Sequence, residues 1–425
     1  MKIALIHDYL AQAGGAERVV AVLQSMFPEA PLYTSVYDPE ATLADFGAAD
    51  VRTSFLQLWP FSSRRFHKLA LPFFPLAFER FDFSGYELAL SSSSSFAKGI
   101  ITPPSTCHVC YCHTPSRFIW RQDEYLRQNQ ALSVGAGLIG SLINTLRSWD
   151  VASAQRVDYF VANSYNIARR IRKFYRRDVA AVIYPPVETA KFKPAPPEEI
   201  GGHFLVVSRL LNYKRLDLAV KACTRLEASL RVVGIGPELK RLQQMAGPTV
   251  EFLGRLSDTE VALEMARCKA LIFPGEEDFG ITPVECMASG RPVVAYGAGG
   301  ALETVIAGKT GLFFHEQTVE SLAEALREIE RVTFSQTMLR EHALTFDTAV
   351  FEARMRELLD LALEDFRCQN GDAAIQRKSL FPCTSDQSTS FPPPRSLAGQ
   401  SADVNVSKRT LDSKSFVRKS TYERT

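Results

Sequence analysis

Short apolar runs alternate with stretches of helical spacing along most of the chain. The first run, in KIALI at residues 2–6, precedes a loop with Gly14 and Gly15 and then the helical pattern AERVVAVLQSMF. Further short apolar runs lie at Leu88–Leu90, Cys107–Cys112, Tyr159–Ala162 and Ala181–Tyr184. Helical patterns separate them, for example at residues 152–156 and 166–175. This alternation predicts an α/β fold with a doubly wound parallel sheet.

The pattern breaks at residues 185–202 and then begins again. The stretch YPPVETAKFKPAPPEEIGG contains five prolines and no apolar period, so it predicts an interdomain linker. Beyond it, apolar runs in HFLVVSRL, SLRVVGIG, TVEFLGRL, KALIFPG and RPVVAYG again alternate with helical stretches. We therefore predict two doubly wound domains, residues 1–184 and 203–348, with a cleft in which ligands bind at the carboxyl ends of the strands.

The C-terminal region changes character. Residues 349–365, AVFEARMRELLDLALED, predict an amphipathic helix, and residues 366–425, rich in Ser, Thr and Pro, predict a disordered tail. The tail holds 10 basic and 5 acidic residues, a net charge of +5, within a total of +2 for the 425 residues. The other 39 basic and 42 acidic residues give −3, which argues against a nucleic acid partner.

Composition and targeting signals favour a globular protein of a reducing compartment. Apolar residues make up 46% and charged residues 23% of the chain. MKIALIHDYL lacks the length and cleavage site of a signal peptide, and no apolar run approaches the ~20 residues of a membrane span. Cys107, Cys110 and Cys112 alternate with apolar residues, which favours buried strand thiols over a zinc site. We expect a cytoplasmic protein.

Four acidic residues gather in PGEEDFGITPVECMASG, Pro274 to Gly290, directly after an apolar run. Three are adjacent, Glu276–Asp278, and Glu285 follows. In one interpretation Thr282 caps a helix, Pro283 is its first residue and Glu285 reaches back to the Thr282 amide. In the other, the acids bind a polyhydroxyl ligand, because carboxylates accept strong hydrogen bonds from sugar hydroxyls. Capping explains one acid of the four, and the spacing leaves both interpretations open.

Basic and glycine residues also follow predicted strands. Arg209 and Lys214 come after FLVV, where two cations would suit a pyrophosphate. Taken alone they are better explained by a solvated loop, but their place in the same predicted sheet as Glu277 favours the pyrophosphate. The glycines of AQAGGAER and YGAGGALE could let backbone amides approach a phosphate, but neither segment has the spacing G-x-G-x-x-G. His113 ends an apolar run before a proline turn, a place where a structural histidine is the commoner case.

Taken together, residues 1–365 resemble glycosyltransferase family 4. The most specific mark is E-x7-E, met by Glu277 and Glu285, with MASGRPVVAYGAGGALETV downstream and the Arg209/Lys214 pair upstream. HDYLAQAGGAERV, CYCHTPSRFIW and RSWDVASAQRVDYFVANS resemble most the bacterial mannosyltransferases that build O-antigen or exopolysaccharide. The resemblance implies a GT-B fold, in which two Rossmann-like domains face each other across a cleft. The N-terminal domain would meet the acceptor, and the C-terminal domain would hold a nucleotide-sugar.

The resemblance also implies a role for each matching residue. Glu277 would contact the hydroxyls of the donor sugar and Glu285 the ribose, while Arg209 and Lys214 would hold the diphosphate. His113 would lie near the transferred sugar and complete the catalytic set. The implied donor-binding residues are Gly14, Gly15, Phe279, Gly280, Ile281, Glu285, Gly234 and Gly236. Near the last two the base would be contacted chiefly by backbone, which does not distinguish GDP from UDP.

No cofactor and no metal are implied, because the nucleotide-sugar is a substrate and the family retains anomeric configuration without a metal. The chain has no D-x-D motif, so protein cations would replace Mg²⁺ at the diphosphate. No side chain is an evident nucleophile, which favours a front-face transfer. We expect mannose transfer from GDP-mannose to a glycan or polyprenyl-diphosphate-linked acceptor. A UDP-sugar donor, a sugar-nucleotide epimerase and a non-catalytic nucleotide-sugar-binding protein are the alternatives.

The acceptor side offers a second candidate surface. Residues 54–81, SFLQLWPFSSRRFHKLALPFFPLAFERF, interleave aromatic residues with Arg64, Arg65, His67 and Lys68. This composition suits a peripheral contact with anionic headgroups. The alternative is a pair of short helices packed on their own domain, since two prolines interrupt any long amphipathic helix.

Overall fold

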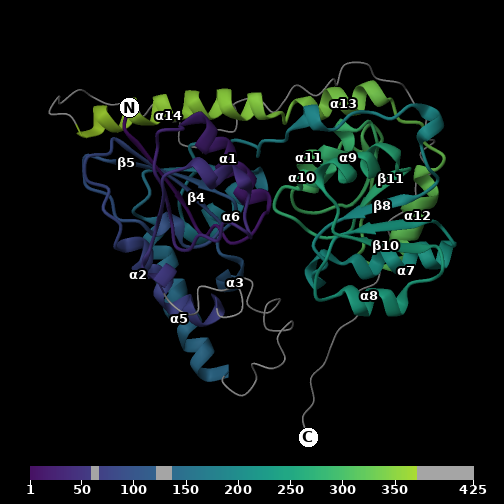
Figure 1. Ribbon diagram of the computed structural model, residues 1–425, viewed down its shortest axis with the longest axis horizontal. Helices are drawn as coiled ribbons and strands as arrows, with labels where there is room; N and C mark the ends of the chain where they lie inside the picture. The colour runs from purple at the N-terminus through teal and green to yellow at the C-terminus, as the bar shows by residue number, and fades with distance from the viewer. Residues whose placement is uncertain (59–66, 121–135, 371–425) are drawn as a thin grey trace, which may run out of the picture. The chain divides into compact units, whose positions relative to one another are not determined.

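The computed structural model describes residues 1–58, 67–120 and 136–370, and within them the chain forms two β-sheets (Figure 1). The first sheet consists of β1 (Ile3–His7), β2 (Leu32–Thr34), β3 (Val51–Thr53), β4 (Leu88–Ser93), β5 (Cys107–Cys112), β6 (Tyr159–Ala162) and β7 (Ala181–Val182). The second consists of β8 (Phe204–Val207), β9 (Leu230–Val233), β10 (Val250–Gly254), β11 (Ala270–Phe273), β12 (Val293–Tyr296) and β13 (Gly311–Phe314).

Helices follow most strands, as the sequence pattern predicts. In the first part of the chain they are α1 (Gly15–Met26), α2 (Phe74–Glu79), α3 (Arg117–Trp120), α5 (Ala136–Ala154) and α6 (Tyr165–Tyr175). In the second they are α7 (Leu216–Leu226), α8 (Leu239–Met245), α9 (Asp258–Arg267), α10 (Ile281–Ala288), α11 (Ala301–Thr304), α12 (Val319–Ile329), α13 (Gln336–Leu344) and α14 (Thr348–Asn370). Among the short 3₁₀ helices are η3 (His67–Phe73), η4 (Ala97–Gly99) and η8 (Asn212–Lys214).

Both sheets are parallel and doubly wound, which confirms the predicted fold class. The strand order is β3-β2-β1-β4-β5-β6-β7 in the first sheet and β10-β9-β8-β11-β12-β13 in the second. Every pair of neighbouring strands runs in parallel. The order reverses between β1 and β4 and between β8 and β11, and ligands of open α/β sheets bind at the carboxyl ends of the strands at such reversals.

Strand residues alternate between two apolar layers, because successive side chains of a strand point to opposite faces. In β4, Leu88 and Leu90 pack in one core with residues of α1 and α14, whereas Ala89 packs on the other face with Phe74 and Phe78 of α2. The second sheet is built in the same way: Phe204 of β8 faces one core and Leu205 the other. Burial on both faces explains why the strands are continuous apolar runs.

The last helix, α14, returns to the first sheet. It contacts β5 and α1 and lies beside them in Figure 1. Its apolar stripe, with the spacing of one helix face, is buried in the same core as Leu88; the buried members are Phe351, Met355, Leu358, Leu359, Ala362 and Leu363. The helix extends to Asn370, beyond the predicted end at residue 365, because Phe366 packs on this core and Arg367 donates to Glu87 Oε1 at 2.6 Å. Residues 371–425, the rest of the predicted tail, lie outside the described residues.

The packing of α14 predicts that Met355→Ala lowers the free energy of unfolding by about 2–5 kcal/mol, because it leaves a cavity in a fully buried site. Urea unfolding followed by circular dichroism measures the change. Glu357→Ala on the exposed face of the same helix is the control, with an expected change within about 0.5 kcal/mol. Equal effects of the two substitutions would show that α14 does not contribute to this core.

Candidate functional site

Lys214 and Glu277 meet at the carboxyl ends of β8 and β11, where the strand order of the second sheet reverses. Lys214 ends η8 after β8, Glu277 lies in the loop between β11 and α10, and the two side chains form an ion pair. Gly275 permits this approach, since a Cβ there would lie 3.0 Å from the Lys214 Cα. The structure therefore brings together two residues that the sequence placed 63 positions apart.

Arg209 also follows β8, but its side chain contacts a loop of the N-terminal part of the chain. Its Nη1 donates to Gln12 Oε1 at 3.3 Å, and Gln12 Nε2 donates to Glu17 Oε1 at 3.0 Å. Gln12 belongs to the loop after β1 that also holds Gly14. Arg209 thus lies against the glycine loop of the N-terminal part, and its role at a diphosphate stays a prediction.

The helix start at α10 differs from the predicted cap, which was wrong. The helix begins at Ile281 with Gly280 as its N-cap residue, at φ 96°, and no side chain caps it. Glycine adopts this left-handed conformation without strain, so the chain turns before Thr282, which falls inside the first turn. Glu285 is therefore free of the capping role, and its buried carboxylate accepts a hydrogen bond from Arg18 Nη1 at 2.8 Å. Burial raises the pKa of Glu285, and Arg18 opposes that effect.

The side chain of Phe279 is part of the core. It is 3% exposed, and its ring centroid lies 5.3 Å from that of Tyr184 and 5.7 Å from that of Phe346. Two glycines support the backbone here: Gly300 N donates to the Glu277 carbonyl at 2.8 Å, and a Cβ on Gly299 or Gly300 would overlap the backbone of residues 277–279. The glycines of YGAGGALE thus hold the acidic loop, a structural role that the phosphate interpretation missed.

Gly234 and Gly236 serve a close crossing of two strand-end loops. Gly234 has φ 136°, and a Cβ there would overlap the Ser208 carbonyl. A Cβ on Gly236 would overlap the Leu210 carbonyl, and Leu210 N donates to the Ile235 carbonyl at 3.0 Å. This crossing accounts for both glycines structurally, and contact with a nucleotide base stays a prediction.

The predicted residues of the N-terminal part lie at the carboxyl edge of the first sheet. Gly14 is the N-cap residue of α1, and a Cβ on Gly15 would lie 3.0 Å from Ile281 Cδ1. His113 follows β5, and its Nε2 forms a 2.8 Å hydrogen bond with Ser92 Oγ. Burial lowers the pKa of His113 to about 4, so the ring is neutral near pH 7 and acts as a hydrogen-bonding group.

Asp8, which sequence reasoning missed, organises the loop after β4. Its carboxylate is buried and accepts hydrogen bonds from Ser94 N and Oγ at 2.6 and 2.9 Å, from Phe96 N at 2.6 Å and from Ala97 N at 2.7 Å. These bonds tie the end of β1 to the end of β4, where the order of the first sheet reverses. A charged residue directly after the buried strand IALIH was the signal that could have revealed it.

Arg117 and Arg170 were missed as well, and they are the partners of the two acids that sequence reasoning left without a role. Arg170 donates to Asp278 Oδ1 at 2.6 Å and to Glu276 Oε1 at 2.9 Å, and Arg117 donates to Asp278 Oδ2 at 2.6 Å. Each of the three adjacent acids, Glu277 included, therefore has a cation beside it. This arrangement resolves how three carboxylates are tolerated in one loop.

The cysteine prediction is confirmed, whereas metal independence stays a prediction. Cys107, Cys110 and Cys112 are buried in β5 as free thiols, and burial raises the pKa of Cys110 to about 12. Across residues 1–58, 67–120 and 136–370, no group of three or more His, Cys, Asp or Glu side chains could hold a metal ion.

The predicted membrane element is described only in part. Arg64 and Arg65 lie outside the described residues. In α2, Phe74 and Phe78 are buried against the first sheet, so this helix packs on its own domain, while Leu76 is 47% exposed. In the part of the chain that the structure describes, no helix combines the length and apolar character needed to span a bilayer.

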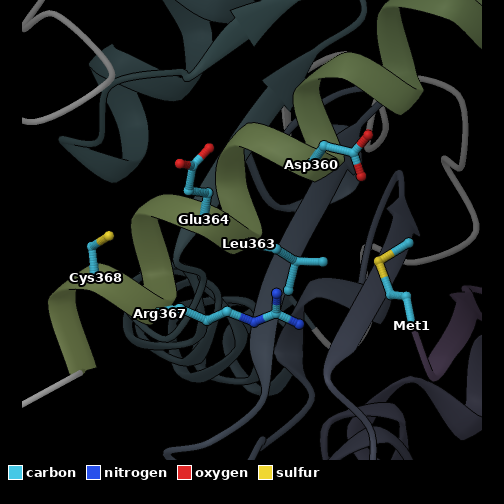
Figure 2. A pocket seen from close by; sticks show the side chains of 6 residues that line it. All are labelled: Met1, Asp360, Leu363, Glu364, Arg367 and Cys368. Carbon is cyan, nitrogen blue, oxygen red and sulfur yellow. The ribbon is translucent and has the colours of Figure 1, made fainter.

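A pocket of about 540 Å³ lies elsewhere, beside α14 and the N-terminus (Figure 2). Its lining residues are Met1, Asp360, Leu363, Glu364, Arg367 and Cys368. Met1 precedes β1, so this pocket is at the amino ends of the strands, and none of the predicted site residues lines it. We therefore place the candidate site at the carboxyl ends of the strands.

Two doubly wound sheets, with the candidate residues at the carboxyl ends of their strands, define a protein of the GT-B class. Among solved structures, Alr3699/HepE from Anabaena, crystallised in complex with UDP, matches with a TM-score of 0.63 over 85% of this chain and 100% of that chain, at 20% identity. This likeness shows the fold. Residues 188–344 match the family described as "Glycosyl transferases group 1".

Two curated relatives are mannosyltransferases. The human alpha-1,3/1,6-mannosyltransferase ALG2 is 26% identical over 256 residues, which cover 52% of this chain and 58% of that protein. The GDP-mannose-dependent alpha-(1-6)-phosphatidylinositol monomannoside mannosyltransferase of Mycobacterium tuberculosis strain H37Rv is 30% identical over 195 residues, which cover 39% and 51%. The chain thus spans little more than half of the length of each of these relatives.

Proposed function

We propose that the protein is a retaining, metal-independent glycosyltransferase that moves mannose from GDP-mannose to a glycan or lipid-linked glycan acceptor. The observation that carries the proposal is the Lys214–Glu277 ion pair at the strand reversal of the second sheet. The match of residues 188–344 to "Glycosyl transferases group 1" and the two mannosyltransferase relatives support it. A role in cell-surface polysaccharide synthesis rests on the sequence resemblance described above.

In this proposal, Lys214 and Arg209 stabilise the nucleoside diphosphate as it leaves. Cleavage of the bond between the sugar and the diphosphate places additional negative charge on the phosphate oxygens, and fixed cations lower the energy of that state. Glu277 accepts hydrogen bonds from the sugar hydroxyls and Glu285 from the ribose. Arg18 is hydrogen-bonded to the Glu285 carboxylate in this structure, so the ribose would either share this carboxylate with Arg18 or displace Arg18 from it.

A UDP-sugar donor is the second candidate. Alr3699/HepE has been crystallised with UDP, and in this proposal the loops near Gly234 and Gly236 would contact the base chiefly through backbone groups. Neither observation distinguishes one donor sugar from another. A nucleotide-binding protein without transferase activity would use the same groups, and it differs in having no turnover.

We further propose a cytoplasmic location, with the acceptor met on the N-terminal side. The exposed apolar residues Phe73 and Leu76 support a peripheral contact, since they lie in the segment 54–81 that the sequence singled out. Sedimentation with anionic vesicles tests it: an Arg64/Arg65/Lys68 to Glu variant that sediments as well as the wild type would contradict membrane contact through this segment.

The donor proposal predicts that GDP raises the melting temperature more than UDP or ADP does. A nucleotide at about 100 times its Kd stabilises the folded state by about 2.7 kcal/mol. Thermal shift with the three nucleotides measures this, and transfer assays with the matching sugars follow. The Glu277→Gln variant separates the two candidate functions. A transferase is expected to lose turnover, whereas a nucleotide-binding protein without transferase activity can lose only affinity. If none of the three nucleotides shifts the melting curve, the donor assignment is wrong.

A further inference from the structure

Asp278 connects the loop of the second sheet to two elements of the first. Both of its carboxylate oxygens are engaged, Oδ2 by Arg117 of α3 at 2.6 Å and Oδ1 by Arg170 of α6 at 2.6 Å. Its carbonyl accepts from Ser164 Oγ at 2.8 Å, and the same serine caps α6. The Asp278 side chain is 13% exposed and that of Arg170 16%, so this is a mostly buried network rather than a surface pair.

Two further links between the two sheets have the same polarity, whereas the Arg209–Gln12 hydrogen bond has the opposite one. Glu303 accepts hydrogen bonds from Tyr165 N and Asn166 N, both at 2.8 Å, at the N-terminus of α6, where the helix dipole favours an anion. Glu285 accepts from Arg18 of α1. In each of these carboxylate links the second-sheet side supplies the carboxylate and the first-sheet side supplies the donor.

This polarity matters for Glu277, which stands between two of the linked acids. Glu276 and Asp278 are both held by Arg170, so the backbone of Glu277 is fixed on each side. Arg117 Nη2 also lies 3.8 Å from Glu277 Oε2. Without the two arginines, three adjacent carboxylates would repel one another and spread, and the anionic diphosphate of a donor would increase that repulsion.

We propose that Arg117 and Arg170 are positioning residues, which bind Asp278 and Glu276 and thereby aim Glu277 at the donor sugar. The proposal rests on the proposed function, because Glu277 matters only if a sugar is bound. The proposal predicts different effects on two quantities that a purely structural contact would change together. The affinity for a bare nucleotide depends on the second-sheet loops, whereas the additional affinity given by the sugar, and kcat, depend on the direction of Glu277.

The test compares Arg170→Gln, Asp278→Asn and the double variant with the wild type. For each protein, calorimetry gives the Kd of GDP and of GDP-mannose, and a transfer assay gives kcat; UDP and UDP-glucose replace them if the wild type prefers UDP. Each single variant is expected to lower kcat by about 10–100-fold and to reduce the gain in affinity due to the sugar, with the Kd of GDP within about twofold of the wild type. The double variant is expected to lose less activity than the product of the two single losses, because each single variant already removes the Arg170–Asp278 contact.

Arg172→Gln is the matched control. Arg172 lies on the same helix and pairs with Asp178 at 2.8 Å, but its side chain is 58% exposed and the contact stays within the first-sheet side. If Arg170→Gln behaves like Arg172→Gln, or weakens GDP and GDP-mannose equally, the positioning role is wrong.

Failure of the proposed function would look different. A wild type that binds no nucleotide at all contradicts the transferase, whereas the contact itself is decided by ligand-free unfolding of the same four proteins. Additive destabilisation by Arg170→Gln and Asp278→Asn would contradict the link, and non-additive destabilisation would support it.

Discussion

Replacing Lys214 with methionine is expected to lower kcat for sugar transfer by about 10²–10³-fold, the cost of removing one preorganised donor from a site where charge develops. Lys214 is held in place, because its ammonium group pairs with Glu277 and its backbone is packed against Gly275. Methionine keeps the length and most of the packing of the stem while removing the charge. The loss should therefore fall on the reacting state more than on folding.

Steady-state kinetics with a saturating donor measures the effect, and Lys221→Met is the control. Lys221 lies on α7, close in sequence but exposed to solvent, so kcat should stay within about twofold of the wild type. A Lys214→Met enzyme with unchanged kcat would remove the lysine from the transfer step. A lower kcat accompanied by a lower melting temperature in the absence of nucleotide would indicate that the ion pair serves stability instead.

The sequence predicted the fold because the apolar runs are strong and local. Both sheets are buried on two faces, so strands such as β4 and β8 read as continuous apolar segments, and glycine and proline mark where they stop. The end of α14 was placed too early, because the contacts that extend it, Phe366 on the core and Arg367 with Glu87, involve residues far away in sequence. Local composition carries no signal for such contacts.

The candidate site was predictable to the extent that it lies on strand ends. Lys214 and Glu277 each follow an apolar run, and parallel strands bring such positions to one edge. The partners of Glu276 and Asp278 were not predictable, since Arg170 is 106 and 108 residues from them on a helix with an ordinary polar face. The cap at Thr282 failed for a local reason, because Gly280 turns the chain at positive φ two residues before the predicted threonine cap.

Asp150→Ala is expected to be among the most destabilising single substitutions, lowering the free energy of unfolding by about 3–5 kcal/mol. Asp150 is buried in α5 and forms an ion pair with the buried Lys98 of η4, while Trp120 Nε1 donates to its other oxygen at 2.7 Å. Alanine would leave the Lys98 ammonium buried without its counter-charge, which costs more than the pair itself contributes. Lys98 also donates to the Ser95 carbonyl at 2.9 Å, so the loss would reach the loop that Asp8 organises.

Urea unfolding compares Asp150→Ala with two further proteins. Asp45→Ala, at an exposed position, should change the free energy of unfolding by less than about 0.5 kcal/mol. The double variant Lys98→Met with Asp150→Leu removes both charges and should be less destabilised than Asp150→Ala, because no unpaired ion stays buried. A double variant that is less stable than the single one would mean that the pair stabilises the fold beyond avoiding an isolated charge. In that case the Lys98–Asp150 pair would also stabilise the candidate site, because Lys98 lies in η4, which follows the loop at the strand reversal of the first sheet.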